Sequence, residues 1–395
     1  MRLSTNRSSA FPWRYGLFLA SYYLANAVYQ GYASKYFESV GMSHTQLTIL
    51  LTAAPAISII MQPLWGTIGD RAKLRNNVLR LMITVSAALV LTYRISGAFW
   101  WLLIASTLFS AFYTSVQPMG DSIILESLQH SSQPFGPLRL MGCVTFAVGN
   151  LFIGYAIEGR MNLVLYLTSG VLLLTLLTTR TLAPTPGHQS ATGKKMNPVG
   201  ILRLPHMLPL IVMLMLMQLT MGYFYSFYSP YFTSLEGGST TLLGWCYFLS
   251  AMSEVPFLLN ADRLFEKLGA GKLMSICAAA LTLRWTLLSS FPNIYVAAGS
   301  QILHGWGFIV MTVSMSKYMS AVVPDELKAS GQMLLSLVGF GIARVFGILG
   351  GGLLSQQLGG TQQGFAVMAA VSGAALIVFA PKFLKMKPLN GHTGA

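Results

Sequence analysis

The sequence predicts an all-α membrane protein that crosses the bilayer many times. Of its 395 residues, 54% are hydrophobic and only 9% are charged, and the mean hydropathy is +0.60. A soluble protein of this length would carry about a quarter charged residues. The apolar residues gather in runs of about 20 or more, the length that a helix needs to cross a hydrocarbon core of roughly 30 Å. The lipid bilayer is therefore the solvent of most of this chain.

Twelve such runs follow one another along the chain. We expect helical spans at residues 13–36, 46–68, 76–95, 98–122, 138–157, 161–180, 206–234, 240–261, 271–290, 293–318, 328–356 and 362–382. The segment 183–205, which begins Ala183-Pro-Thr-Pro-Gly, is the one long polar stretch between them. It predicts an N-terminal bundle of six helices (1–182), a cytoplasmic linker (183–205) and a C-terminal bundle of six helices (206–395). Such a layout is expected of a transporter built from repeats, with its substrate site between the halves near the bilayer midplane.

Basic residues indicate the orientation of the chain. They gather before the first span, after the second, in the linker and at the end, at Arg2, Arg7, Arg14, Arg71, Lys73, Arg75, Arg80, Lys194, Lys195, Arg203, Lys382, Lys385 and Lys387. The alternate loops hold few. By the positive-inside rule both termini are cytoplasmic, and we expect the protein in the cell (inner) membrane. The net charge of +14 is spread over short loops, so it does not indicate a nucleic-acid partner.

The loop after the second span carries the sequence Gly66-Thr-Ile-Gly69-Asp70-Arg71-Ala-Lys73-Leu-Arg75. Its glycines let two helix ends approach closely, and Asp70 can cap a helix or pair with a cation. An alternative is a plain basic turn. The stretch resembles the signature of the major facilitator superfamily between its second and third helices, with a weaker echo at Asp262-Arg263. This resemblance implies the major facilitator fold and a cytoplasmic gate at Gly66, Asp70 and Arg71, which latches the two halves in one state and releases them in the other.

Three ionisable residues of the second half lie inside long apolar runs: Glu254, Arg284 and His304. A charged side chain in hydrocarbon costs roughly 2.5–3.5 kcal/mol on insertion scales, so such groups usually face a polar cavity and pair there. Histidine changes charge between about pH 5 and 8. Together they indicate a site that moves a proton or holds a polar solute. The alternatives are a static ion pair that sets helix packing and a hydrogen-bonded core histidine.

In the first half, Asp121 closes the fourth predicted span and Arg139 opens the fifth. A short loop makes these helices neighbours, so the two side chains can meet in a central cavity. Alternatively, both lie at the membrane interface and extend into water. The segment Phe135-Gly-Pro-Leu-Arg139-Leu-Met-Gly142-Cys-Val resembles the fifth helix of proton symporters of the lactose permease type. That resemblance implies that Asp121 and Arg139 bind the solute and that Phe146 packs on it.

The resemblance extends through the second half. Glu254, Arg284 and His304 fall where that permease group has a glutamate, an arginine and a histidine, and the local sequences are still more similar to the phenylpropionate-permease-like branch. The group has a further, proton-binding glutamate one turn after the histidine, where this chain has Gly307. A proton would therefore be accepted by Glu254, Asp121 or His304.

Aromatic and amide side chains add candidates. Tyr223 in the seventh span and Asn26 in the first are expected to form hydrogen bonds in the cavity, although aromatic residues also gather at membrane interfaces. Arg344 in the eleventh span has no acidic partner that the sequence identifies. It either lines the cavity and attracts an anion or extends toward the cytoplasmic surface.

These observations predict a secondary transporter that couples uptake of a small polar solute (a sugar, nucleoside or aromatic acid) to protons by alternating access. Efflux of amphipathic compounds is the alternative, and a membrane sensor is the alternative of another class. The chain has no HExxH or GxSxG motif, so we expect neither an enzyme nor a cofactor or metal. Cys143, Cys246 and Cys277 lie in separate spans and are expected to be buried apolar residues. We expect a monomer.

Overall fold

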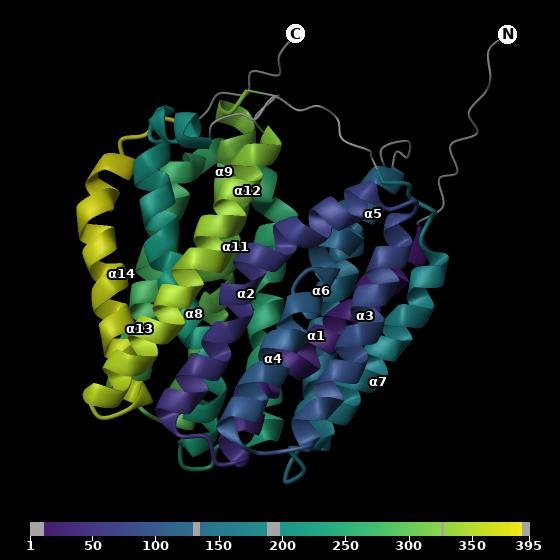
Figure 1. Cartoon of the computed structure of the whole chain (residues 1–395). Helices are drawn as coiled ribbons and strands as arrows, with labels where there is room; N and C mark the ends of the chain where they lie inside the picture. The colour runs from purple at the N-terminus through teal and green to yellow at the C-terminus, as the bar shows by residue number, and fades with distance from the viewer. Residues whose placement is uncertain (1–11, 129–134, 188–197, 325–327, 389–395) are drawn as a thin grey trace, which may run out of the picture.

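The computed structural model describes residues 12–128, 135–187, 198–324 and 328–388, and within these ranges the regular elements are helices (Figure 1). The first half contains seven helical segments. They are α1 (Trp13–Ser39), α2 (His44–Arg71), α3 (Arg75–Leu91), α4 (Phe99–Tyr113), α5 (Val116–Leu128), α6 (Phe135–Ala156) and α7 (Leu163–Thr178). Only Thr114 and Ser115 separate α4 from α5, so these two form one span from Phe99 to Leu128.

The second half continues with α8 (Met207–Ser234), α9 (Thr240–Ser290), α10 (Ile294–Gly299), α11 (His304–Val322), α12 (Lys328–Ser336), α13 (Ala343–Gln357) and α14 (Thr361–Phe383). A 3-10 turn at Ser300–Leu303 joins α10 to α11, and a π-helix at Leu337–Ile342 joins α12 to α13. Each of these pairs therefore forms one continuous helical segment that is long enough to cross the bilayer.

Ten helices in the described ranges are long and apolar enough to span a membrane. One of them, the 51-residue α9, is two helices that meet at Gly269, where φ is +72°. The break therefore supplies an eleventh span. Helix α1, with 27 residues, is long enough to cross but is less apolar than these ten. With it, the helices follow the twelve predicted ranges. The prediction of an all-α, multi-pass membrane protein is confirmed.

The kink in α9 has a local cause. Glycine adopts a positive φ at little energetic cost because it has no Cβ. At Gly269 this conformation lets the chain reverse direction without a loop. The backbone of Pro388 lies against Gly269, and the carbonyl of Phe383 lies against Gly271. The segment from Phe383 to Pro388 thus packs against these two glycines.

The linker begins at one end of the bundle, which we call the linker end. There the backbone amide of Arg75 donates to the carbonyl of Thr185 (2.9 Å). The backbone amide of Gly187 donates to the carbonyl of Ala72 (3.1 Å). The side-chain amide of Asn76 also donates to the carbonyl of Ala183 (3.0 Å). The start of the linker is therefore fixed to the turn between α2 and α3.

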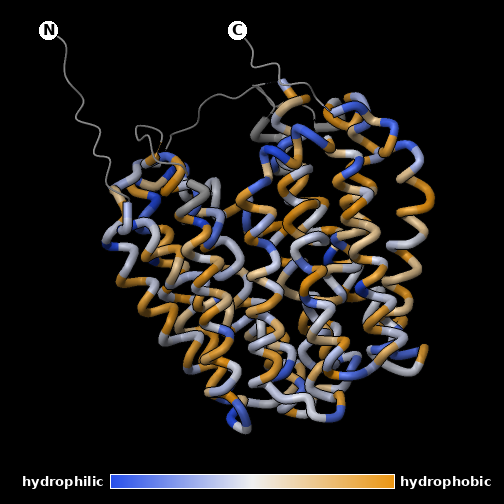
Figure 2. The backbone as a smooth tube through the Cα atoms, turned by 180° about the vertical axis from the view of Figure 1, so that it is seen from behind, coloured by the Kyte–Doolittle hydropathy of each residue, from blue (hydrophilic) through white to orange (hydrophobic). Residues whose placement is uncertain are grey.

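Among the described residues, the hydrogen bonds that join the two halves lie at the opposite end, which we call the far end. His44 Nε2 lies 3.0 Å from the carbonyl of Gly352 and 2.9 Å from the hydroxyl of Ser355, across the contact of α2 with α13. Tyr247 on α9 donates to the carbonyl of Gly31 on α1 (3.0 Å). The halves spread apart toward the linker end (Figure 2). This conformer is thus closed at the far end.

Glu158 adds a carboxylate to the far-end contact. It follows α6 and accepts hydrogen bonds from the Thr240 hydroxyl (2.7 Å), the Thr241 amide (2.8 Å) and the Thr241 hydroxyl (3.0 Å) at the start of α9. A negative charge is favourable at a helix N-terminus. Partial burial raises the pKa of the Glu158 carboxyl, but these hydrogen bonds outweigh it, so the pKa lies below its usual value.

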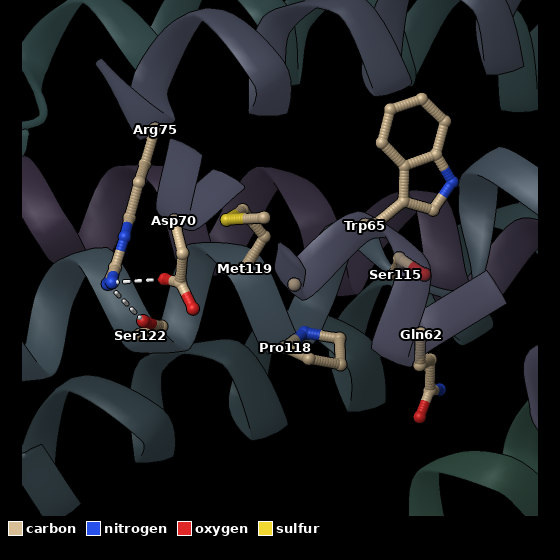
Figure 3. Close-up of a pocket in the computed structure, with 9 residues that line it drawn as sticks. Gln62, Trp65, Asp70, Arg75, Ser115, Pro118, Met119 and Ser122 are labelled. Carbon is tan, nitrogen blue, oxygen red and sulfur yellow. Dashed lines mark hydrogen bonds and ion pairs between the residues drawn. The ribbon is translucent and has the colours of Figure 1, made fainter. Parts of the chain in front are cut away.

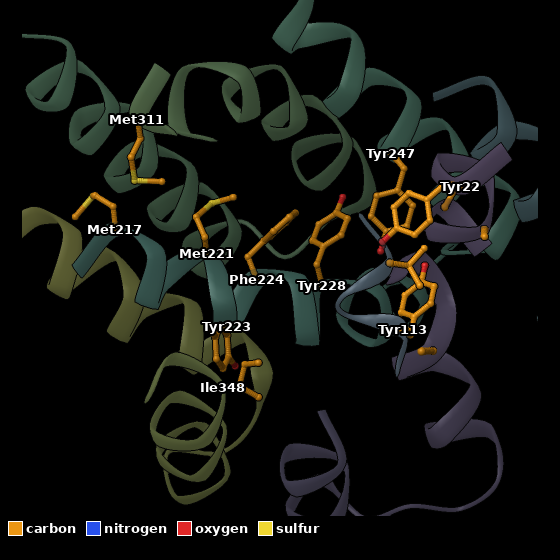
Figure 4. Packing of buried hydrophobic residues seen from close by; sticks show 14 of the residues in the cluster. Tyr22, Tyr113, Met217, Met221, Tyr223, Phe224, Tyr228, Tyr247, Met311 and Ile348 are labelled. Atoms are coloured by element: carbon orange, nitrogen blue, oxygen red, sulfur yellow. The ribbon is translucent and has the colours of Figure 1, made fainter. Parts of the chain in front are cut away.

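Aromatic and methionine side chains fill the interior. Phe224 and Tyr228 on α8 continue a buried row that Tyr247 extends toward Tyr22 and Tyr113 of the first half (Figure 4). Large apolar side chains such as Trp100, Phe152 and Ile377 are instead mostly exposed on the outside, as lipid-facing residues are. Cys246 and Cys277 are buried free thiols, and Cys143 is a half-buried one.

Candidate functional site

Four polar side chains of the second half form one cluster. Glu254 comes from the first segment of α9, Arg284 from its second segment, Gln301 from the 3-10 turn and His304 from the start of α11. His304 Nε2 lies 3.2 Å from Glu254 Oε1, and His304 Nδ1 lies 2.9 Å from a terminal nitrogen of Arg284. The other terminal nitrogen of Arg284 donates to Gln301 Oε1 at 2.6 Å. The histidine therefore stands between the acid and the base that the sequence singles out.

Close helix packing permits this geometry. The Gly305 amide donates to the Ser253 hydroxyl at 2.9 Å. A Cβ at Gly305 would overlap the Ser253 carbonyl, so only glycine lets α11 approach α9 here. The residues on either side, Glu254 and His304, are brought within hydrogen-bonding reach as a result.

The hydrogen-bond partners of His304 determine its protonation. An arginine side chain has donors only, so Nδ1 must accept from Arg284 and carry no proton. The proton then lies on Nε2, which faces the Glu254 carboxylate and the Tyr225 hydroxyl (3.2 Å). A doubly protonated ring would direct an N–H at the guanidinium. The cluster accordingly favours a neutral imidazole that accepts from Arg284 and donates to Glu254.

Arg284 is enclosed by protein. Its side chain is 0% exposed, and its guanidinium lies 4.0 Å from the ring centre of Phe224 and 5.2 Å from that of Trp285. Gln301, His304 and the two ring faces compensate for the water that a buried cation loses. Both terminal nitrogens of Arg284 thus have protein partners, although its Nε has none.

Arg344 lies beside this cluster. Its guanidinium is between the rings of Tyr225 (5.0 Å) and Phe340 (4.9 Å). Its Nε is buried without a hydrogen-bond partner. Because Tyr225 also contacts His304, Arg344 belongs to the centre of the bundle rather than to the linker-end surface.

The first half contributes a second polar group. Asp121 on α5 is hydrogen-bonded to Gln117 one turn earlier, and Gln117 donates to the Tyr23 hydroxyl on α1 (3.2 Å). Arg139 on α6 interacts electrostatically with Tyr23 and Asp121. Gly142 makes room for the Tyr23 ring against α6. Asp121 and Arg139 therefore lie near enough to interact electrostatically.

The polar group of the first half and the polar cluster of the second half lie close enough to interact electrostatically. Arg139 interacts electrostatically with Glu254 as well as with Asp121, and Cys143 lies near both Arg139 and Glu254. Arg139 is nevertheless exposed, and the Glu254 side chain keeps 13% of its surface exposed. Charged side chains of both halves thus lie close to one another, and we call the solvent-accessible region beside Arg139 and Glu254 the central space.

Three other candidates take different places. Asn26 accepts a hydrogen bond from Tyr113 (3.2 Å), beside the group of the first half. Phe146 is half-buried, one turn of α6 beyond Gly142. Tyr223 is fully buried and donates to the carbonyl of Thr361 (2.9 Å), so in this conformer its hydroxyl is directed into the packing of α8 with α14.

The predicted gate residues lie at the linker end. Asp70 pairs with Arg75 (2.5 Å), and Arg75 also contacts Glu126 (3.2 Å) and Ser122 (3.1 Å) of α5. Asp70, Arg75 and Ser122 border a cavity of about 110 Å³ that Gly66, Gln62 and Trp65 also line (Figure 3). Arg71 is exposed. In this conformer the partner of Asp70 therefore belongs to its own half.

Sequence reasoning missed several residues that complete these groups. Gln301 lies three residues before His304 and so on the same helix face, which is a signal that could have found it. Tyr225 stood in an aromatic run that covers every face of its helix, so nothing in the pattern selected it. Arg75 was part of the loop motif but had no assigned role.

Comparison with known proteins agrees with this architecture. The chain is 24% identical to the maltose permease of Geobacillus stearothermophilus over 352 residues, which cover 87% of this chain and 88% of the permease. It is 24% identical over 375 residues to a probable 3-phenylpropionic acid transporter of Escherichia coli strain K12, covering 91% and 94% of the two chains. The solved nucleoside transporter NupG superposes with a TM-score of 0.82 at 16% identity, covering 95% of this chain and 99% of the other.

A family model is decisive. The model described as the MFS_1 like family matches residues 12–367, which span both halves and every polar side chain of the two central groups. The predicted resemblance to the permease group is confirmed. The chain belongs to the MFS_1-like family of major facilitator transporters and is a secondary transporter rather than an enzyme.

Proposed function

We propose that the protein imports a small polar solute together with protons by alternating access. The observation that carries this proposal is the position of Glu254. It accepts from neutral His304 in one half, interacts with Arg139 of the other half, and keeps part of its surface exposed. A proton that reaches this carboxylate from the central space therefore changes an interaction between the halves.

The switch follows from charge. Ionised Glu254 attracts Arg139 and orients the Nε2–H of His304. Protonated Glu254 attracts neither strongly, so the free-energy difference between conformers changes with its charge. Since Gly307 replaces the second glutamate of the lactose permease group, Glu254 is our choice as the proton acceptor.

The orientation of the chain supports uptake. The linker end carries the basic loops around Arg71 and Lys73, so by the positive-inside rule it faces the cytoplasm. The conformer closed at the far end is then inward-open, ready to release solute and proton. The names of the relatives support a sugar, a nucleoside or an aromatic acid as solute.

Proteoliposomes provide the test. Wild-type protein should accumulate one of radiolabelled maltose, uridine or 3-phenylpropionate when the outside is acidic. Glu254→Gln should lose accumulation against the gradient but keep exchange of solute for solute. The matched control is Glu236→Gln, at an exposed loop position, which should behave as wild type. Undiminished active uptake by Glu254→Gln would refute the role of Glu254.

Efflux is the second candidate, favoured by a methionine- and aromatic-rich interior that can adapt to amphipathic compounds. Right-side-out and everted vesicles discriminate the two directions under the same proton gradient. A sensor would show solute binding without movement of solute or protons in either vesicle type.

A further inference from the structure

We propose that the solute is a small organic monoanion whose carboxylate binds Arg344, with its apolar body against the rings around that arginine. This inference rests on the proposed transport function and specifies its solute class.

The surroundings of Arg344 are the first reason. Two ring faces hold its guanidinium, Tyr225 at 5.0 Å and Phe340 at 4.9 Å. In the part of the chain that the structure describes, no carboxylate lies within ion-pair distance of it, and no hydrogen bond to its side chain is formed. A guanidinium presents five donors in a planar fork that matches a carboxylate. Those donors are positioned but unused.

The other two central arginines differ. Arg284 is fully buried and already bonded to Gln301 and His304. Arg139 faces Asp121 and Glu254. An incoming anion would have to displace internal partners at Arg284, and at Arg139 it would meet the negative charges of Asp121 and Glu254. No acidic side chain of the described residues acts on Arg344 in this way.

The charge of the site is the second reason. Arg139, Arg284 and Arg344 contribute three positive charges, and Asp121 and Glu254 contribute two negative ones. His304 is neutral by its hydrogen bonds, so the group carries one net positive charge. Uncompensated charge is costly in a low-dielectric interior. One monoanion neutralises the group, a neutral sugar leaves the charge in place, and a dianion reverses it.

The backbone next to Arg344 is the third reason. The π-helix at Leu337–Ile342 ends directly before α13, in which Arg344 is the second residue. Short π-helical turns are frequent at functional sites because they rotate the following residues. Gly341 lies against Ile59 of α2, which brings this turn to the contact with the first half. Phe308, whose ring stacks on His304 (5.6 Å), and Phe340 offer apolar surface beside the guanidinium.

The test compares acids with their neutral amides on the purified, full-length protein. Thermal unfolding is followed with 3-phenylpropionate, benzoate and hexanoate, and with 3-phenylpropanamide, benzamide and hexanamide. At least one acid should raise the midpoint and its amide should not. This comparison needs no variant. An amide as effective as its acid, or no effect of any acid, would overturn the proposal.

Variants then locate the anion. Arg344→Gln should weaken binding of the effective acid by on the order of 10- to 100-fold, the loss expected for a charge-assisted pair. Arg344→Lys should recover part of it, since charge returns without the fork. Arg94→Gln, at an exposed position of the far end, is the control and should bind as wild type. Unchanged acid binding in Arg344→Gln would contradict the assignment.

Failure of this inference is distinguishable from failure of the proposed function. Proton-coupled accumulation of maltose or uridine, with no binding of acids, would overturn the anion and leave transport intact. Acid binding that depends on Arg344, with no solute movement in proteoliposomes, would support the anion and overturn transport.

Discussion

At the scale of single residues, His304 lies between Arg284 and Glu254 and contacts both side chains. Its two ring nitrogens have opposite roles, accepting from Arg284 and donating toward Glu254. A buried arginine that loses such a partner is left with an unsatisfied donor, which costs about 1–3 kcal/mol or more for a charged group. The ring is thus part of the folded structure as well as of the site.

We therefore expect His304→Gln and His304→Phe to differ sharply. A glutamine offers one acceptor and one donor group, so it can retain both contacts in part. A phenylalanine keeps an aromatic ring but offers neither. His304→Phe should lower the unfolding midpoint and abolish proton-coupled uptake, while His304→Gln should keep solute exchange. Equal behaviour of the two variants, in thermal unfolding and in proteoliposomes, would show that the hydrogen bonds contribute nothing.

Much of this site was accessible from sequence, because ionisable residues inside apolar runs are rare and costly. Glu254, Arg284 and His304 were found in that way. Their order in space was not, because sequence spacing does not show that His304 enters between the other two. The sequence does not determine the place of Arg344, because its partners are the rings of Tyr225 on α8 and Phe340 in the π-helix rather than an acid.

At the scale of helices, the contact of α9 with α11 depends on a missing side chain. Gly305→Ala would drive a methyl group into the Ser253 carbonyl, and overpacking of this kind costs about 1–3 kcal/mol. We expect a lower unfolding midpoint and loss of uptake, since Glu254 and His304 would separate.

Gly350→Ala is the matched control for that substitution. It also lies within a helix, but nothing is within 4 Å of the position that its Cβ would take. Its midpoint should be unchanged or slightly higher, because alanine favours helix. A Gly305→Ala variant as stable and active as Gly350→Ala would contradict the close-contact argument.

The helices themselves were largely predictable, since length and hydropathy determine where a chain can cross lipid. The details that differ have local causes. The spans predicted at 240–261 and 271–290 are the two segments of α9, which meet at Gly269 without an intervening loop. The span predicted at 328–356 is divided by a π-helix, which hydropathy does not register.

At the scale of the whole molecule, the far-end contacts decide which end is open. The pKa of the Glu158 carboxyl is lowered by its hydrogen bonds to α9. Above pH 4.5, the ordinary pKa of this carboxyl, the contact therefore contributes its full stabilisation of far-end closure. That contribution is lost as the pH falls through the lowered value. Acid should therefore weaken closure of the far end.

Spin labels at Lys73 and Arg263, exposed positions of the two halves at the linker end, measure this equilibrium. Wild-type protein at pH 7 should show mainly long distances. Glu158→Gln should increase the short-distance population about two- to five-fold, the size expected for a charge at a helix N-terminus. The difference between wild type and variant should vanish at pH values below the lowered pKa of Glu158. A difference that persists there would refute this role of Glu158.

The native thiols provide a chemical report on the same equilibrium. Cys143 borders the central space beside Glu254, whereas Cys246 and Cys277 are buried elsewhere in the packing. N-ethylmaleimide should therefore alkylate Cys143 first, at a rate that mass spectrometry can follow peptide by peptide. Any compound that occupies the central space, or that favours a conformer closed at the linker end, should slow that reaction. The wild-type chain therefore already contains a reporter with which to screen for its solute.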